Sequence, residues 1–310
     1  MTKLLKEKML DLVALCKKVI SDGGNIVITG HDNPDADSVL SSVMMQGLLW
    51  RAGVDAEIKL PTPPDSVTLR DMQTLGIWDD SLVCPFDDGD LLLLVDHHKS
   101  FYKNRVIACV DHHTTPPAPE CELAIVIKAS SCGKIIYDMM RACEISSEED
   151  ELLALYSVYL DTQSCRSSKF NREDAPWIEK CIEKYSLDRE ALELMGFCLN
   201  SSDTAVDELA TYAYKRYELG GKTSASSCLQ IDVNDEKWQG VIESVIEHLS
   251  RKVMDEDYAA WALVINMPKE CRSDIYWIYR NGNVEKVALD RLASRSRDVI
   301  PVVSSLKQNK

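Results

Sequence analysis

The 310-residue sequence lacks C-x-x-C pairs, glycine-rich nucleotide motifs and long apolar runs. Without C-x-x-C, zinc ribbons and thioredoxin-type redox motifs are excluded. Neither G-x-x-x-x-G-K-[ST] nor G-x-G-x-x-G occurs, so a phosphate-binding loop of either type is not expected. A serine hydrolase is disfavoured because the sequence contains no G-x-S-x-G elbow. Apolar runs such as Leu91–Val95 fall far short of the ~20 residues that cross a membrane.

Positive charge is also scarce, because 35 Lys and Arg residues face 50 Asp and Glu residues, for a net charge of −15. Phosphate backbones would be repelled, so we expect no stable nucleic-acid complex, although a small phosphate substrate could bind where cations gather. The cysteine count of eleven is odd, and the first 20 residues read as a charged amphipathic helix instead of a signal peptide. We therefore expect reduced thiols, a cytoplasmic location and no membrane association.

Short β-rich runs alternate with helical patterns over the first half of the chain, which is typical of a parallel α/β sheet. We predict an α/β protein in which residues 1–186 form a doubly wound parallel-sheet domain. Residues 187–310 are predicted to form a smaller mixed α/β domain, with a long helix over 189–219. The predicted strands of the first domain are 25–29, 54–60, 91–95, 105–110 and 123–128.

Five of the six histidines stand beside aspartates at the ends of predicted strands. In open α/β sheets, ligands bind outside the carboxyl ends of the strands. The first cluster, GHDNPDADS at 30–38, lies there: Asp35 and Asp37 would face the same way in an extended loop, and Ser38 is the expected N-cap of the next helix. Further candidates follow other strands or end a helix, namely Asp96, Asp111, His112, His113 and Asp161.

Imidazole and carboxylate groups without thiolate suit Mn, Co, Mg or Fe. The candidates outnumber the ligands of one ion, whereas two ions ~3.5–4 Å apart with a bridging carboxylate would use them all. Four carboxylates would balance the charge of two divalent ions, and such a centre can accept a polyanion and activate water for phosphate-ester or anhydride hydrolysis. A single Asp-His pair is usually a turn or a core histidine, but three such clusters together favour a site.

These residues resemble a known pattern. His31-x-x-x-Asp35-x-Asp37, Asp96, Asp111-His112-His113 and Asp161 together resemble the DHH phosphoesterase superfamily. Within it, GHDNPDADS is most similar to the first motif of the manganese-dependent (family II) inorganic pyrophosphatases. The C-terminal half resembles the DHHA2 domain, and SRSRDVIP at 294–301 is similar to the family's Ser-Arg-Lys-Lys-Gln-Val-Val-Pro.

The resemblance implies two divalent ions, with Mn²⁺ expected and Co²⁺ or Mg²⁺ as alternatives, and a homodimer. One ion would be held by His31, Asp35 and the bridging Asp96, which is also a catalytic candidate. The second would be held by Asp37, Asp96, His112 and Asp161. By the same resemblance, His113 would contact the substrate phosphate or help to protonate the leaving group, while Arg295, Arg297 and Lys222 would bind the anion from the second domain.

The expected function is hydrolysis of inorganic pyrophosphate to two phosphates by a metal-bridged hydroxide. The chain departs from the family at His98 and Lys99, where Asn and Glu are usual, and at Ser296 and Asp298. The alternatives are therefore a phosphoesterase that acts on polyphosphate, short oligonucleotides or cyclic dinucleotides, and a non-catalytic phosphate- or nucleotide-binding protein. No Gly-Gly-Gly-His stretch of the related nucleases occurs.

Overall fold

The computed structural model describes residues 2–98, 102–114, 120–197, 205–219, 222–233 and 238–305, without the side chains of Leu219 and Ser296. The chain divides into two compact units. The first contains Met1–Pro64, Thr68–Cys165 and Lys169–Met195, and the second contains Asp65–Val67, Arg166–Ser168 and Gly196–Lys310. The expected functional division after residue 186 stays a prediction.

The first unit contains a five-stranded parallel sheet in the order β2-β1-β3-β4-β5. The strands are β1 (Asn25–Thr29), β2 (Glu57–Ile58), β3 (Asp90–Val95), β4 (Val106–Asp111) and β5 (Leu123–Val126). Chain order reverses at β1, which has β2 on one side and β3 on the other, so the loops after β1 and β3 leave the sheet at a topological switch point. The predicted α/β class and parallel sheet are confirmed.

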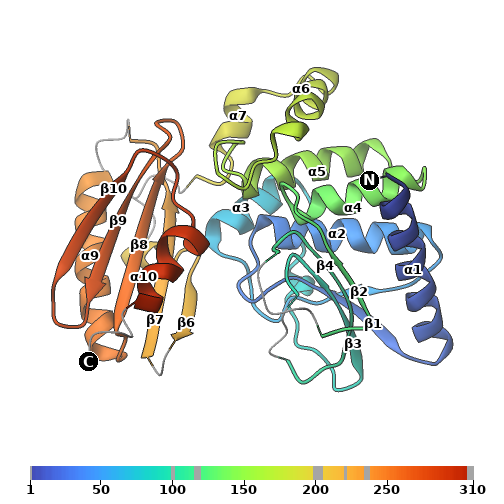
Figure 1. Ribbon diagram of the computed structural model, residues 1–310, viewed down its shortest axis with the longest axis horizontal. Coiled ribbons are helices and arrows are strands. Elements are labelled where there is room, and N and C mark those ends of the chain that lie inside the picture. The colour runs from blue at the N-terminus through green and yellow to red at the C-terminus, as the bar shows by residue number, and fades with distance from the viewer. Residues whose placement is uncertain are drawn as a thin grey trace. The chain divides into compact units, whose positions relative to one another are not determined.

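Helices pack on the sheet and on one another in the first unit, as Figure 1 shows. Ile26, Ile28, Leu93 and Val95 face this helical layer and are buried in its core. The other face of the sheet, with Val27 and Leu94, packs against side chains that include Phe86 and Tyr102. The helices and short helical turns are α1 (Thr2–Ser21), α2 (Ala36–Arg51), α3 (Ser66–Thr74), η1 (Asp80–Leu82), α4 (Cys132–Ala142), α5 (Glu148–Asp161), η2 (Arg172–Asp174), α6 (Ala175–Lys184) and α7 (Arg189–Leu194).

The second unit contains a mixed sheet in the order β10-β9-β8-β7-β6, in which only the pairing of β7 with β8 is parallel among the described strands. Leu249 of α9 and Leu263 of β8 share a core on one face, and Val264 and Val303 share one on the other. The elements are α8 (Val206–Ala210), β6 (Lys215–Leu219), β7 (Lys222–Gln230), α9 (Trp238–Asp255), β8 (Ala260–Met267), β9 (Arg272–Tyr279), β10 (Val284–Leu289), η3 (Arg295–Val299) and α10 (Ile300–Ser305).

The predicted long helix over 189–219 is wrong. Helix α7 ends at Leu194, and Gly196 adopts a φ of +79° that a helix cannot continue through. Lys215–Leu219 is a strand that pairs antiparallel with β7. The sequence KRYEL has no helical apolar stripe of its own, and its pairing with a distant strand decides its conformation.

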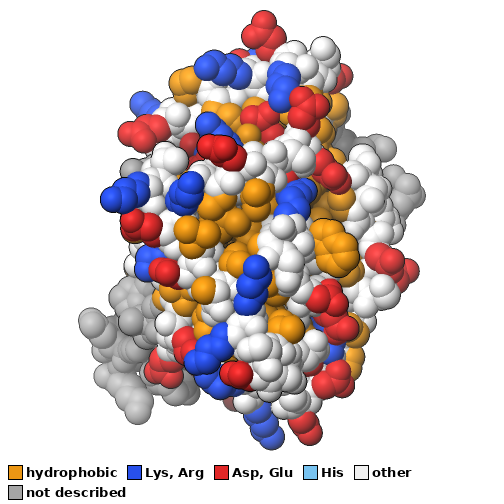
Figure 2. All heavy atoms as spheres, turned by 90° about the vertical axis from the view of Figure 1, so that its right-hand side faces the viewer, with side chains coloured by type: hydrophobic (Ala, Val, Ile, Leu, Met, Phe, Trp, Pro, Cys, Tyr) orange, Lys and Arg blue, Asp and Glu red, His pale blue; other side chains and the backbone are white. Residues whose placement is uncertain are grey.

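The described part of the chain contains no helix long and apolar enough to span a bilayer. Helix α1 leaves Leu4 and Leu10 about half exposed, and Trp50 of α2 is 72% exposed. Figure 2 shows the face that lies on the right-hand side of Figure 1, where hydrophobic side chains form patches among charged ones. The expected homodimer stays a prediction.

Candidate metal centre

The candidate ligands meet at the carboxyl ends of β1, β3 and β4, beside the start of α2 and the end of α5. Asp96 follows β3 directly and has a φ of +62°, a left-handed conformation that is unfavourable for a residue with a β-carbon. Its backbone N–H donates to Val110 O at 2.9 Å, which ties this residue to β4. Strained backbone of this kind concentrates at functional sites.

The start of α2 differs from the prediction. Asp35, not Ser38, is the N-cap, and its carboxylate accepts a hydrogen bond from Ser38 N at 3.2 Å. Ser38 Oγ instead donates to Asp96 Oδ2 at 2.7 Å. Asp35 belongs to the group of His31 and Asp37 to that of His112, so the two carboxylates have different neighbours. The expectation that they face the same way stays a prediction.

The first group consists of His31, Asp35 and Asp96, whose ligand atoms lie within 4.8 Å of one another. His31 Nε2 lies 3.4 Å from Asp35 Oδ2 and 3.5 Å from Asp96 Oδ2. His31 Nδ1 lies 2.9 Å from the carbonyl of Asp32. A carbonyl can only accept, so Nδ1 carries the proton and Nε2 is left to act as a ligand.

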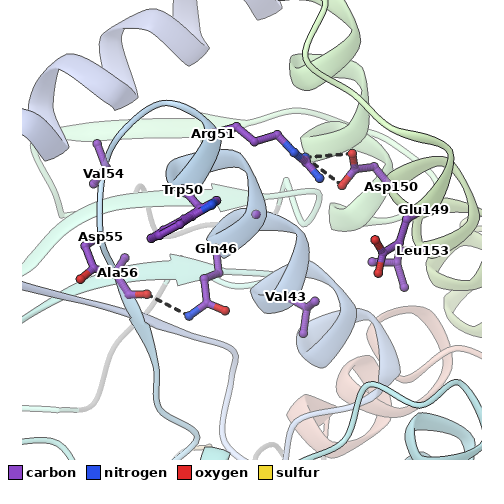
Figure 3. A pocket seen from close by; sticks show the side chains of 11 residues that line it. Val43, Gln46, Trp50, Arg51, Val54, Asp55, Ala56, Glu149, Asp150 and Leu153 are labelled. Atoms are coloured by element: carbon purple, nitrogen blue, oxygen red, sulfur yellow. Dashed lines mark hydrogen bonds and ion pairs between the residues drawn. The ribbon is translucent and has the colours of Figure 1, made fainter.

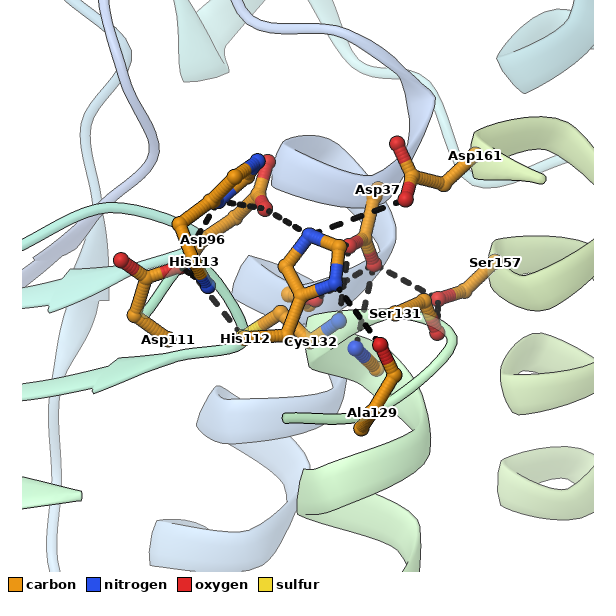
Figure 4. A network of polar contacts seen from close by, with 12 residues as sticks. Asp37, Asp96, Asp111, His112, His113, Ala129, Ser131, Cys132, Ser157 and Asp161 are labelled. Carbon is orange, nitrogen blue, oxygen red and sulfur yellow. Dashed lines mark hydrogen bonds and ion pairs between the residues drawn. The ribbon is translucent and has the colours of Figure 1, made fainter. Parts of the chain in front are cut away.

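The second group surrounds His112, as Figure 4 shows. His112 Nε2 lies 3.2 Å from Asp96 Oδ1, 3.6 Å from Asp161 Oδ2 and 3.8 Å from Asp37 Oδ2. Its Nδ1 donates to the carbonyl of Ala129 at 3.2 Å, which again directs Nε2 at the carboxylates. The two oxygens of Asp96 thus face different histidines, so Asp96 is shared by both groups.

Three ligand atoms at this centre are buried and make no hydrogen bond within the described structure: Asp96 Oδ1, His112 Nε2 and Asp161 Oδ2. Leaving a buried polar atom unsatisfied is unfavourable, and a bound cation would satisfy these three atoms. Nitrogen and oxygen donors without thiolate are the set that Mn²⁺, Co²⁺ or Mg²⁺ accepts. The residues present therefore fit divalent cations.

Electrostatics at the centre point the same way. Burial, and after it the nearby charge of Asp96, raises the pKa of Asp37 to about 8. Burial also opposes ionisation of Asp96, but the imidazoles of His112 and His113 hold the pKa of its carboxyl below the usual range. Burial lowers the pKa of His112, yet the charges of Asp161 and Asp96 outweigh it and raise that pKa to about 10. The close carboxylates favour a positive charge beside them, which is why they raise the pKa of the neighbouring imidazole. A divalent cation bound there would supply such a charge.

Asp37 is held from several sides. Its Oδ2 accepts from the backbone N–H of Cys132 at 2.7 Å, and its Oδ1 accepts from that of Gly133 at 3.1 Å and from Ser157 Oγ at 2.6 Å. Cys132 and Gly133 are the first residues of α4, so the carboxylate satisfies N–H groups that a helix start leaves open.

His113 is positioned by Asp111, a candidate to which the sequence assigned no separate role. Fully buried Asp111 accepts at Oδ1 from both the N–H and Nδ1 of His113 at 2.9 Å, and its Oδ2 accepts from Nδ1 of buried His98. Burial opposes ionisation of Asp111, but the hydrogen bond from His113 keeps its pKa below the usual value. His98, a departure from the family pattern, therefore supports Asp111. Lys99 lies outside the described residues.

Lys169 is a residue at the centre that the sequence motifs do not reveal. Its Nζ lies 2.5 Å from Asp161 Oδ1, on the side of the carboxylate away from His112. Nothing in the local sequence, SSKFN, distinguishes this lysine from a surface residue. Only the course of the loop after α5 places it here.

The predicted anion-binding residues lie in the second unit. Arg295 Nη1 donates to Ala213 O at 2.6 Å, and Arg297 Nη2 donates to Leu292 O at 3.0 Å. Lys222 is exposed at the start of β7. Asp298, another departure, is paired with Arg291. The role of the three cations stays a prediction, and the side chain of Ser296 lies outside the described set.

A separate pocket of about 470 Å³ lies around the C-terminal half of α2, away from the aspartates at its start. Trp50 and Arg51 line it, and Arg51 is paired with Asp150 at 2.9 Å (Figure 3). Gln46 Nε2 donates to Ala56 O at 2.9 Å across the pocket wall. None of the candidate metal ligands lines this pocket.

Comparison with known proteins places the site in a family context. Residues 25–161 match the profile of the DHH family, N-terminal domain, and all six predicted metal ligands fall within that range. Residues 25–161 are thus similar to the N-terminal domain of the DHH family.

The relatives are more specific. The manganese-dependent inorganic pyrophosphatase of Bacillus subtilis is 23% identical over 308 residues, which cover 90% of this chain and 97% of that protein. A probable manganese-dependent inorganic pyrophosphatase of Deinococcus radiodurans is 26% identical over 241 residues, 71% of each chain. The crystal structure of a candidate family II inorganic pyrophosphatase from Methanococcus jannaschii has a TM-score of 0.74 at 19% identity and covers 92% of this chain and 100% of that one. This likeness shows that the fold is shared.

Proposed function

We propose that the protein is a manganese-dependent phosphohydrolase that cleaves inorganic pyrophosphate into two phosphates. The observation that carries the proposal is the shared carboxylate of Asp96, whose two oxygens face two separate groups of nitrogen and oxygen ligands. The relatives named as manganese-dependent inorganic pyrophosphatases support the choice of substrate and metal.

In this proposal His31, Asp35 and Asp96 hold one ion, while Asp37, Asp96, His112 and Asp161 hold a second. When bound, divalent ions supply a lowered pKa for water and offset the negative charge of phosphoryl oxygens.

The protein's own groups perform the remaining tasks. Asp111 fixes the orientation of His113 through Nδ1, which leaves Nε2 of His113 to contact a phosphoryl oxygen or to deliver a proton to the departing phosphate. Ser38 and Ser157 hold the carboxylates of Asp96 and Asp37 in place by hydrogen bonds, so that little rearrangement is needed when substrate binds. The proposal gives Arg295, Arg297 and Lys222 the task of binding the anion, since guanidinium and ammonium groups suit phosphate.

The experiment is phosphate release from pyrophosphate with Mn²⁺, run beside tripolyphosphate, polyphosphate and a cyclic dinucleotide. We expect selective release from pyrophosphate, lost by at least about 100-fold in Asp96→Asn, because even residues that only support a ligand cost 10–100-fold when removed. Asp88→Asn, which removes an exposed carboxylate of the same unit, is the matched control. Unchanged activity in Asp96→Asn, or cleavage of only the other substrates, would contradict the proposal.

A further inference from the structure

Lys169 brings a positive charge to the candidate metal centre. Its ammonium contacts Asp161 Oδ1 at 2.5 Å, whereas Asp161 Oδ2 faces His112 Nε2 at 3.6 Å. One carboxylate therefore lies between the lysine and the second ligand group. The Lys169 side chain is 38% exposed, so its flexible stem can reach a bound molecule.

The loop that carries Lys169 is firmly shaped. After α5 the chain passes through three successive residues in the left-handed region, Gln163, Ser164 and Cys165, with φ of +52°, +56° and +64°. Side chains with a β-carbon rarely adopt this conformation, and a run of three is maintained only where the surroundings enforce it. Thr162 Oγ1 accepts from Cys165 N at 3.0 Å, and beyond Lys169 the N–H of Asn171 donates to Ser130 Oγ at 3.0 Å. The fold thus returns Lys169 to the end of α5.

A lysine at this point opposes cation binding. An ammonium group in contact with Asp161 offsets the charge that this carboxylate would offer an ion, and like charges repel. The position is favourable if the ammonium group of Lys169 binds a polyanionic substrate. Pyrophosphate carries several negative charges, whereas two divalent ions would only balance the four carboxylates of the centre, so an additional ammonium group would favour binding of this anion.

We propose that Lys169 is a substrate-binding residue, whose ammonium binds a phosphoryl oxygen when pyrophosphate occupies the centre and shares or releases Asp161 at that moment. The inference rests on the proposed function and deepens it. It assigns a phosphate-binding cation to the same compact unit as the metal ligands, in addition to the cations predicted in the second unit.

The test compares Lys169→Met and Lys169→Gln, which remove the charge, with Lys169→Arg, which keeps it. Lys180→Met removes an exposed lysine of α6 and serves as the matched control. Binding of inorganic phosphate to the Mn²⁺-loaded protein is measured by calorimetry, KM and kcat are measured for pyrophosphate, and Mn²⁺ affinity is measured without substrate.

We expect Lys169→Met and Lys169→Gln to weaken phosphate binding and raise KM by about 10- to 100-fold, the usual effect of losing a charge-assisted hydrogen bond. Lys169→Arg should restore most of the affinity, and Lys180→Met should match the wild type. Mn²⁺ affinity should be equal or tighter in Lys169→Met, because a like charge is gone. Melting curves of both neutral variants check that they fold.

Two results would overturn the inference. The first is unchanged phosphate affinity and KM in both neutral variants. The second is weaker Mn²⁺ binding in these variants together with phosphate affinity and KM that return to wild-type values in excess Mn²⁺, because Lys169 would then only support Asp161. Failure of the proposed function is distinct, because the wild type would then bind phosphate without hydrolysing pyrophosphate. In that case the phosphate-binding comparison still decides the role of Lys169.

Discussion

Removal of the shared carboxylate by Asp96→Asn should abolish stabilisation by Mn²⁺. A ligand that binds only the folded state at 100 times its dissociation constant adds about 2.7 kcal/mol to the free energy of unfolding, so two ions would add about 5 kcal/mol. For a unit of 150–250 residues each kcal/mol raises Tm by about 2–4 °C, which gives a shift of about 10–20 °C. Asp96 faces both ligand groups, so Asp96→Asn should lose almost the whole shift.

The size of the loss separates the two groups. Asp35 belongs only to the group of His31, so Asp35→Asn should retain about half of the shift. The assay is thermal unfolding followed by circular dichroism, with Mn²⁺, with EDTA and with Mn²⁺ restored, beside metal content by atomic absorption. Asp88→Asn should keep the full shift. The reasoning is refuted if Mn²⁺ leaves Tm of the wild type unchanged, or if Asp96→Asn responds as the wild type does.

Three further outcomes concern stability and thiol reactivity. Burial raises the pKa of Glu151, but hydrogen bonds from two tyrosines, a lysine and a tryptophan outweigh burial and lower this pKa from 4.5 to about 2. The ionised group therefore stabilises the fold above pH 4.5, and this stabilisation is lost as the pH falls towards 2. Acid titrations by circular dichroism should show up to about 3 kcal/mol less pH-dependent stability in Glu151→Gln over this window; equal curves would contradict the pairing. Gly133→Ala should lower the free energy of unfolding by about 1–3 kcal/mol in urea titrations, because the new Cβ would lie 2.5 Å from Ser157 Oγ; a neutral effect would mean that the helix shifts freely. A hydrogen bond with the thiol of Cys109 lowers the pKa of Cys121 to about 7. Mass spectrometry after brief iodoacetamide treatment at pH 7.5 should therefore find Cys121 labelled before exposed Cys271, and this preference should be lost well below pH 7. Labelling of Cys271 before Cys121 would refute the prediction.

Much of the architecture could be predicted because it depends on local pattern. The buried run NIVIT and the run LLLLV have the length and composition of central parallel strands, and both form them. Aspartates that follow such strands must gather at one sheet edge, so the meeting of Asp35, Asp37 and Asp96 needs only the topology.

The parts that were missed depend on contacts between distant segments or on backbone conformation. The neighbours of Asp35 and Asp37 depend on where α2 begins, and its N-cap is Asp35, three residues before the predicted Ser38. Lys169 reaches the centre through three left-handed residues that no sequence pattern announces. Asp111 was seen within a motif, but its contact with His98 depends on how two loops meet.

The hydrogen bonds from the start of α4 to Asp37 connect the candidate metal centre to the helical layer of the first unit. The amide protons of Cys132 and Gly133 both end on this carboxylate, and α4 packs against α1, α2 and α5. Their rates of exchange with deuterated solvent therefore report how firmly the carboxylate is held. Because the start of α4 is buried, a change in the exchange rate of these two amides would report a change at the candidate metal centre. The measurement requires neither an activity assay nor a metal ion with a visible absorption band.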